Sequence, residues 1–286
     1  MEGGRFQVVT NEQTHMVVEA EGGRCLGGYG ASYYRPWVAP LYTPSGLSVL
    51  HEFPHDHPFH NGVFVAQSPV VAGQREANFW ALPMPRWPGD EFCTRVGRVD
   101  CSEPASAEPH ERGVRFTQRA IWRNDGEGPV FDEVRTVDLL AIEDATVCDV
   151  VSRRTAAFGR VLCPKTKFGS VGMRVEVRLL PPLGGAVLAD AGRRGTAEAV
   201  CGGESDFVAY ENSLSGGGVF GVFLTVMDEG ARGPWFVRDY GLAMYNPTWS
   251  HPITLPAGGT WTVSLRVVAY DGPLTDERAA RWRGLA

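Results

Sequence analysis

Four of the chain's seven histidines lie within ten residues of one another, in the stretch 51–60. Imidazole transfers protons near neutral pH and binds borderline metal ions, so this density of histidine predicts a chemical site. Pro54 and Pro58 fix their own φ angles and cannot donate backbone hydrogen bonds, which favours a shaped loop over a regular helix or strand. The apolar run 63–67 follows directly and predicts a buried strand. The histidines are therefore expected at the mouth of a β-structure.

The histidine loop has three interpretations. As a metal site, His55, His57 and His60 with Asp56 would supply part of a nitrogen and oxygen ligand set, although the spacing matches no well-defined metal motif. As a metal-free site, one or two imidazoles would transfer protons or bind substrate, while Asp56 or Glu52 fixes a tautomer. As an ordinary loop, the histidines would only hydrogen-bond water and backbone.

Two further stretches are candidates for binding. The only lysines of the chain, Lys165 and Lys167, precede a predicted strand that carries Arg174 on its polar face. These cations would suit a carboxylate, a phosphate or a polarised oxygen, and they would equally suit a solvated sheet edge. The segment 235–249 holds five aromatic residues. Such residues form platforms for carbohydrate-like ligands, but more often they pack in a core.

Alternation of apolar and polar residues along the chain predicts an all-β fold. We expect residues 1–286 to form one domain, a large antiparallel two-sheet β-sandwich of roughly fifteen strands with long loops. The only helical pattern is short and C-terminal, with Thr275 as its cap and Gly284 as its end. Expected half-buried strands lie at 114–123, 173–179 and 261–267, strands covered on both faces at 145–151 and 219–227, and exposed or proline-rich loops at 79–93, 102–111 and 230–235.

Charge and composition narrow the classes of partner. The formal net charge is −6 and no basic run occurs, which argues against nucleic acid or an anionic membrane surface. No apolar stretch approaches the ~18 residues of a transmembrane helix, and the N-terminus lacks the features of a secretory signal. The six cysteines are scattered without CxxC pairs and are expected to be reduced thiols. We therefore expect a cytoplasmic protein that acts on a small-molecule substrate, with a homodimer left open.

Several blocks of sequence form a recognisable set, spread in order from residue 35 to the C-terminus. They include Phe-Pro-His-Asp-His-Pro-Phe-His-Asn-Gly at 53–62, Lys-Phe-Gly-Ser-Val-Gly-Met-Arg at 167–174 and Arg-Asp-Tyr-Gly at 238–241. These blocks resemble the DUF6807 family, which also carries the label "methane oxygenase PmoA". The resemblance implies a large β-sandwich of the galactose-mutarotase type and a role in sugar catabolism. The label matches the name of a membrane subunit, and the sequence offers no membrane-spanning segment to support it.

The chain departs from the family pattern at informative positions. The family reads Asp-His-Pro-His-His-Arg-Gly where this chain has residues 56–62, so Phe59 and Asn61 replace a histidine and an arginine. Gln67 and Phe236 stand where two later family histidines are expected. The comparison implies that a metal centre shared by the family is impaired here. It also implies that the pocket accepts a less polar substrate than the pockets of other family members. This would suit a specialised member of the family that acts in natural-product metabolism.

The leading hypothesis is a small-molecule enzyme of the lyase, isomerase or hydrolase type that uses acid–base catalysis on a carbohydrate-like or natural-product substrate. His57 and His60 would transfer protons, and Asp56 would orient one of them. No cofactor is expected, with a divalent metal as the alternative. The residues expected to bind substrate or to stabilise negative charge on its oxygens are Lys167, Arg174, Arg238, Tyr240, Trp80, Phe59 and Asn61.

Two other functions stay open at this point. One is a mononuclear copper- or iron-dependent oxygenase, for which His55, His57 and His60 would be the ligands. The other is a non-catalytic carbohydrate-binding sandwich that uses the aromatic segment 235–249 as a platform.

Overall fold

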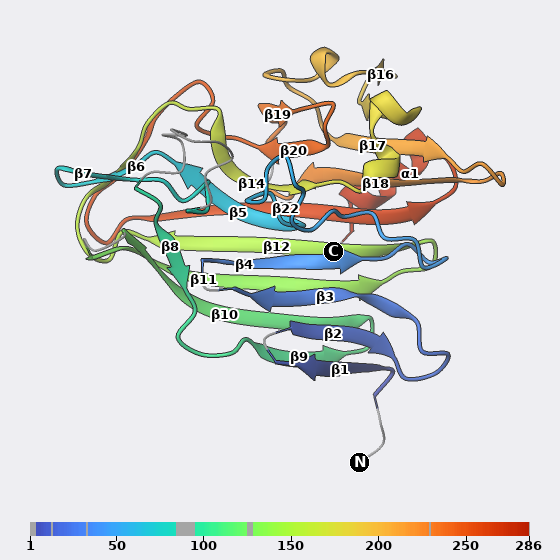
Figure 1. Ribbon diagram of the computed structural model, residues 1–286, viewed down its shortest axis with the longest axis horizontal. Helices are drawn as coiled ribbons and strands as arrows, with labels where there is room; N and C mark the ends of the chain where they lie inside the picture. The colour runs from blue at the N-terminus through green and yellow to red at the C-terminus, as the bar shows by residue number, and fades with distance from the viewer. Residues whose placement is uncertain are drawn as a thin grey trace.

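The computed structural model describes residues 4–12, 14–32, 34–83, 95–124, 128–228 and 230–285. They form two large antiparallel sheets, whose strands overlap in the view of Figure 1, and a small third sheet. The main hydrophobic core takes side chains from both large sheets. The expectation of a large antiparallel β-sandwich with one short C-terminal helix is confirmed, and the third sheet was not anticipated.

The three sheets have the following strand orders. The eight-stranded sheet runs β1 (Phe6–Asn11), β2 (Thr14–Glu19), β3 (Cys25–Ala31), β4 (Pro36–Leu41), β5 (Val63–Ser68), β14 (Phe168–Arg174), β20 (Leu242–Tyr245) and β19 (Trp235–Val237). The ten-stranded sheet runs β16 (Arg194–Gly195), β15 (Ala186–Ala189), β17 (Val208–Ser213), β18 (Val219–Val226), β22 (Thr260–Asp271), β12 (Ala145–Thr155), β11 (Gly128–Ala141), β10 (Gly113–Asn124) and β8 (Arg98–Asp100), and β9 (Ser106–His110) also pairs with β10. The four-stranded sheet runs β21 (Ile253–Leu255), β13 (Val161–Cys163), β6 (Val70–Ala72) and β7 (Arg75–Ala77).

Successive side chains of a strand point to opposite faces of its sheet, so only every second residue reaches the main core. In β5, Val63 and Val65 pack between the large sheets. Their neighbours Phe64 and Ala66 point to the opposite side and join a second apolar cluster. The strands expected at 63–67, 114–123, 145–151, 219–227 and 261–267 are all present, as β5, β10, β12, β18 and β22.

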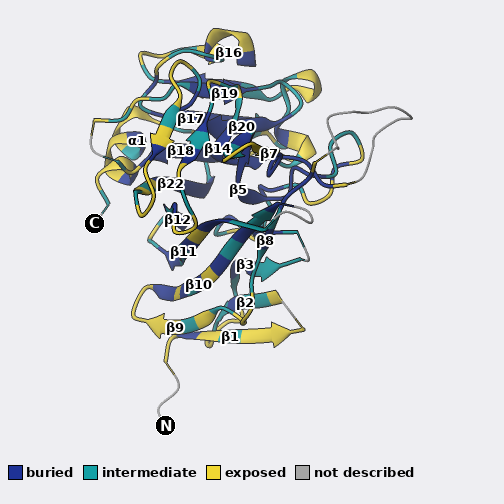
Figure 2. Cartoon of the chain, turned by 90° about the vertical axis from the view of Figure 1, so that its left-hand side faces the viewer, coloured by how far each residue is buried: buried dark blue, intermediate teal, exposed yellow. Residues whose placement is uncertain are grey.

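Two expected elements were wrong. The strand expected at 173–179 ends at Arg174, and residues Val177–Leu179 form a 3-10 helix, η2, followed by η3 (Pro181–Leu183). The two prolines at 181 and 182 cannot donate to a strand ladder, which favours the turn. The loop expected at 102–111 contains β9, because its backbone pairs with the first residues of β10 despite a loop-like composition. Figure 2 shows β9 and β1 largely exposed at the sandwich edge.

The remaining short elements complete the fold. A further 3-10 helix, η4 (Ala197–Ala199), lies between β16 and β17. Of the loop expected at 79–93, residues 84–93 lie outside the described part of the chain, whereas 230–235 is irregular up to the start of β19, as expected. Among the described residues, no helix is long and apolar enough to cross a membrane.

The helix α1 (Asp276–Arg283) covers the outer face of the ten-stranded sheet. Thr275 caps it by accepting a hydrogen bond from the backbone N–H of Arg278, and Gly284 ends it, as the sequence predicts. Trp282 is fully buried against Phe223 and Tyr270, with ring centroids 5.5 and 5.0 Å away. The Trp282 indole therefore forms part of a second hydrophobic core on this face of the sheet.

Replacing this indole tests how much the helix contributes. We expect Trp282→Ala to lower the free energy of unfolding by about 3–5 kcal/mol, because it removes a large buried side chain and leaves a cavity. Phe158→Ala, at a side chain that is 51% exposed, should change it by less than about 0.5 kcal/mol. Urea unfolding of both variants measures the difference, and equal small effects would contradict the docking of α1.

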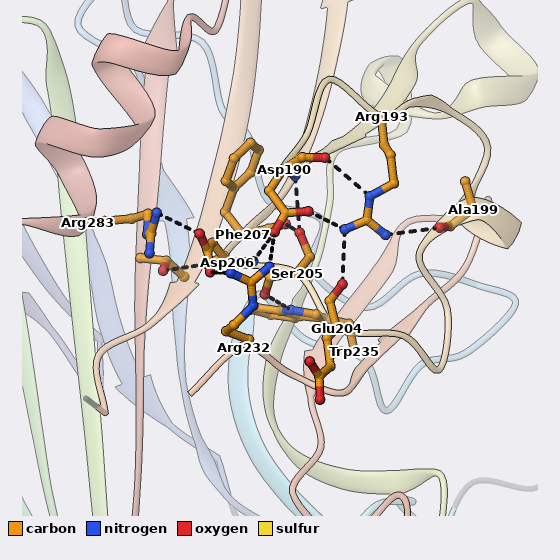
Figure 3. A network of polar contacts seen from close by, with 11 residues as sticks. Asp190, Arg193, Ala199, Glu204, Ser205, Asp206, Phe207, Arg232, Trp235 and Arg283 are labelled. Atoms are coloured by element: carbon orange, nitrogen blue, oxygen red, sulfur yellow. Dashed lines mark hydrogen bonds and ion pairs between the residues drawn. The ribbon is translucent and has the colours of Figure 1, made fainter. Parts of the chain in front are cut away.

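A polar network ties the end of α1 to three loops (Figure 3). Asp190 accepts hydrogen bonds from Arg193, from Arg232 at 2.6 Å and from the backbone N–H of Asp206 at 3.0 Å. Asp206 in turn pairs with Arg232 at 2.7 Å and with Arg283 of α1 at 2.9 Å. Burial raises the pKa of Asp190, but the Asp206 amide and Arg193 outweigh that effect and hold the pKa below its usual value.

The sign of this shift predicts how stability depends on pH. A carboxylate with a depressed pKa stabilises the fold above the pKa of the unfolded chain, and this contribution is lost as the pH falls through the folded pKa. Asp190→Asn should therefore lower the melting temperature most near pH 7, and the gap to the unmodified protein should shrink below about pH 4. Asp132→Asn, on the exposed side of β11, is the control, and a gap that stayed constant with pH would refute the assignment.

Candidate functional site

The candidate site lies on the outer face of the eight-stranded sheet, over β5, β14, β20 and β19. Phe64 and Ala66 of β5, Leu242 and Met244 of β20 and Phe236 of β19 point to this side. Since the opposite faces of the same strands fill the core between the sheets, the sheet forms a rigid floor for the site. The histidine loop, residues 51–62, folds over this floor.

The two ends of the histidine loop are pinned to β14. The His51 N–H donates to the Arg174 carbonyl at 2.9 Å, the Arg174 N–H donates to the Gly62 carbonyl at 2.8 Å, and the Gly62 N–H donates to the His51 carbonyl at 3.0 Å. Gly62 has a φ of 51°, and a Cβ there would lie 2.0 Å from the Val38 carbonyl oxygen. Glycine is therefore required where the loop enters β5. This closure brings Arg174 beside a loop more than a hundred residues away in sequence.

Arg174 organises the polar side of the site. Its Nη2 lies 2.8 and 2.9 Å from the two carboxylate oxygens of Asp56, and its Nη1 lies 3.5 Å from Nδ1 of His60. The guanidinium carbon sits 4.8 Å from the centre of the Tyr240 ring. Because Arg174 is only 4% exposed, its charge faces these groups and not bulk water.

Asp56 connects this arginine to His57. Its Oδ2 lies 2.9 Å from Nδ1 of His57. Burial raises the pKa of Asp56, but hydrogen bonds from His57 and Arg174 outweigh that effect and keep the pKa below its usual value. The carboxylate therefore stays ionised near neutral pH and acts only as an acceptor.

These contacts assign opposite tautomers to the two histidines. Since ionised Asp56 only accepts, the neutral His57 ring donates from Nδ1 and carries its lone pair on Nε2. Since Arg174 only donates, His60 accepts at Nδ1 and carries its proton on Nε2. One ring is thus arranged as a base and the other as a hydrogen-bond donor.

The two imidazoles and one phenol ring lie almost parallel. The His57 and His60 centroids are 4.9 Å apart with an angle of 6° between the rings, and the His57 and Tyr240 centroids are 4.7 Å apart with an angle of 12°. A second group of rings is formed by Trp80, Phe168 and Phe236, which contact one another at centroid distances of 5.4 to 6.3 Å.

A cavity of about 220 Å³ is lined by rings of both groups, which meet where Trp80 packs edge-on against His60 with centroids 5.4 Å apart. Seven of the residues expected to transfer protons or bind substrate line it, together with Phe168 and Phe236. The seven are His57, Phe59, His60, Trp80, Lys167, Arg238 and Tyr240. The structure thus brings together residues from four separate stretches of the chain.

Three other singled-out residues do not line the cavity. Asp56 and Arg174 stand behind the histidines and position them. Asn61 is 1% exposed, and its Oδ1 accepts a hydrogen bond from the Phe53 N–H at 3.0 Å, so it shapes the loop. Arg174 lies on the face of β14 opposite Val171 and Met173, but this face is covered by the histidine loop and is not a solvated edge.

Arg35 is a site residue that sequence reasoning missed. Its guanidinium is buried and donates to the carbonyl oxygens of Phe59, Phe79 and Trp80, while its carbon lies 5.0 Å from the centre of the Phe64 ring. It thereby joins two walls of the cavity. The only sequence signal for Arg35 was its place at the start of the blocks that resemble the family, directly before a proline. That pattern does not predict that the side chain is buried.

The histidines of the loop that do not line the cavity have other surroundings. His55 is exposed, and His51 is half-buried, where burial and next the charge of Arg174 lower its pKa. In the described part of the chain, no three His, Cys, Asp or Glu side chains form a group that could hold a metal ion. Metal binding by His55, His57 and His60 therefore stays a prediction. The described residues do not bring these histidines together as a set of metal ligands.

Comparison with known families gives one decisive match. The model of a family of unknown function, DUF6807, matches residues 26–283. The chain belongs to DUF6807. This confirms the family resemblance, and the description lends no support to the label "methane oxygenase PmoA". No curated protein matches the chain.

Three solved structures are similar to this chain at a distance. A putative aldose 1-epimerase from Escherichia coli K12 is 11% identical, with 94% of this chain and 100% of that chain covered and a TM-score of 0.37. A galactose mutarotase-like protein from Lactobacillus casei is 8% identical, with 93% and 100% covered and a TM-score of 0.40. An alpha-galactosidase from Lactobacillus brevis is 9% identical, with 94% and 40% covered and a TM-score of 0.42. These likenesses are too distant to carry an argument about activity.

The assigned tautomers can be measured directly. In long-range ¹H–¹⁵N spectra at about pH 9, where imidazoles are neutral, we expect His57 to be protonated on Nδ1 and His60 on Nε2. Arg174→Met should remove the preference of His60, because its Nδ1 loses the donor. His110→Ala, at an exposed histidine of β9, assigns a signal without disturbing either ring. Identical tautomers for His57 and His60 would refute the arrangement.

Proposed function

We propose that this protein is a small-molecule enzyme of the lyase, isomerase or hydrolase type that works by histidine acid–base catalysis. The observation that carries the proposal is the chain of contacts from Arg174 through Asp56 to His57, which ends on a cavity that His60 also lines. A carboxylate that fixes the tautomer of an imidazole is the arrangement used to prepare a general base. An ordinary surface loop would have no need for it.

The two histidines have complementary roles in this proposal. Nε2 of His57 takes a proton from a carbon or a hydroxyl of the substrate, and the imidazolium that forms is stabilised by Asp56. The N–H of His60 donates to the neighbouring substrate oxygen on which negative charge develops. Lys167 and Arg238, at the same cavity, add positive charge there. The proton on His57 is then returned to the substrate at another atom or to a leaving group.

The walls of the cavity support a carbohydrate-like or natural-product substrate with an apolar face. Aromatic rings make up most of the lining, and they pack well against flat or ring-shaped ligands. The replacement of family histidines by Phe59 and Phe236 falls on this lining, which supports a less polar substrate than the family pattern implies.

Solvent exchange tests the proposal and does not require the product to be identified. The protein is incubated in D₂O with a panel of aldoses, uronic acids and aromatic keto acids, and ¹H NMR follows deuterium entering a carbon next to a carbonyl. His57→Ala and His60→Ala should each slow the exchange by about 10²- to 10⁴-fold, with circular dichroism unchanged. His110→Ala, which removes an exposed imidazole from β9, should have no effect.

The same assay separates the alternatives. Full exchange activity in both His57→Ala and His60→Ala would overturn the proposal. Loss of activity in His55→Ala, together with stoichiometric copper or iron in protein purified without chelators, would favour the oxygenase. Binding of a sugar that is recovered unchanged and unexchanged would favour a non-catalytic carbohydrate-binding protein.

A further inference from the structure

We infer that the cavity binds a small carboxylate joined to a flat unsaturated ring, such as an aryl carboxylate, and not a neutral sugar. The inference rests on the proposed function only in that both concern the same cavity. Two positive side chains, Lys167 and Arg238, line that cavity, and none of the nine described residues that line it is an Asp or a Glu. The charge of the lining is therefore complementary to an anion.

Neither cation is neutralised by the described residues around it. Arg238 donates from Nη1 to the Cys201 Sγ at 3.2 Å and to its neighbour's carbonyl, that of Val237, at 3.4 Å. Lys167 forms no ion pair with any described residue and is exposed at the cavity rim. Arg174, in contrast, has its charge matched by Asp56. Two unmatched cations at one cavity favour a ligand that carries negative charge before any reaction begins.

Aromatic rings hold both cations at the cavity. The Arg238 guanidinium carbon lies 4.5 Å from the centre of the Phe236 ring, and the Lys167 Nζ lies 5.1 Å from the centre of the Phe168 ring. A cation stacked on a ring keeps the hydrogen-bond donors that point away from the ring. The rings therefore position the charges and leave donors for a carboxylate.

The walls determine the rest of the ligand. Besides the two cations and the two histidines, the lining residues that the structure describes are all aromatic. A neutral sugar presents many hydroxyl groups, which need carboxylate or amide partners that the described lining does not supply. A cavity of about 150 Å³ holds benzene, so the about 220 Å³ found here suits one ring with a small charged substituent.

Equilibrium binding of matched probes tests this inference independently of turnover. Calorimetry compares benzoate with its neutral analogue benzamide, with cyclohexanecarboxylate, and with the pair D-galactose and D-galacturonate. We expect benzoate to bind at least tenfold more tightly than benzamide and than cyclohexanecarboxylate, and more tightly than either sugar.

Variants locate the binding charge. Lys167→Gln and Arg238→Gln should each weaken benzoate binding by about tenfold or more, because each removes a charge-assisted contact, and should leave benzamide unchanged. Lys165→Gln is the matched control, since this lysine is exposed two residues away and does not line the cavity. Arg238→Lys, which keeps the charge, should retain part of the affinity and shows that the loss in Arg238→Gln is not misfolding.

The outcomes separate this inference from the proposed function. Equal binding of benzoate and benzamide, preference for D-galactose, or equal losses in Lys165→Gln and Lys167→Gln would overturn the inference and leave histidine catalysis standing. Charge-dependent benzoate binding together with full exchange activity in His57→Ala and His60→Ala would support the inference and overturn the proposed function.

Discussion

The contact between Arg174 and Asp56 is the interaction on which the site depends. It joins the end of β14 to the middle of the histidine loop, and the same guanidinium reaches His60. A planar group with several fixed donors can serve a carboxylate and an imidazole at once, which the single ammonium of a lysine does less well. Without this contact, Asp56 would lose a partner that depresses its pKa, and His60 would lose the donor that fixes its tautomer.

Other buried arginines also join separate segments of the fold through their guanidinium groups. Arg35 joins the carbonyl oxygens of two cavity walls, and Arg266 joins Asp149 to the last turn of α1 through the carbonyl of Trp282. Arg135 lies in the core, where it pairs with Glu133 and donates to the Pro36 carbonyl at 3.0 Å. Each guanidinium binds groups from strands or loops that are distant in sequence, so these residues fix how the layers and loops sit against one another. The near absence of lysine from the chain is consistent with this use of arginine.

The four departures from the family pattern divide into two classes. Phe59 and Phe236 line the cavity, where they replace polar groups by aromatic rings. Asn61 and Gln67 are buried and do not line it, and Gln67 donates to the Thr248 hydroxyl at 3.1 Å. The first pair therefore faces the cavity, and the second pair lies in the buried structure around it.

The sequence by itself determined the fold class, five of the strands, the caps of α1 and the loop that forms one wall of the candidate site, because alternation, capping residues and a dense histidine loop are local patterns. It could not decide that residues 177–179 turn, or that β9 pairs, because both depend on backbone partners elsewhere in the chain. The division of the singled-out residues into those that line the cavity and those behind it was decided only by the tertiary structure. Side chains from loops and strands far apart in sequence meet there, and no spacing along the chain encodes which of them face the cavity.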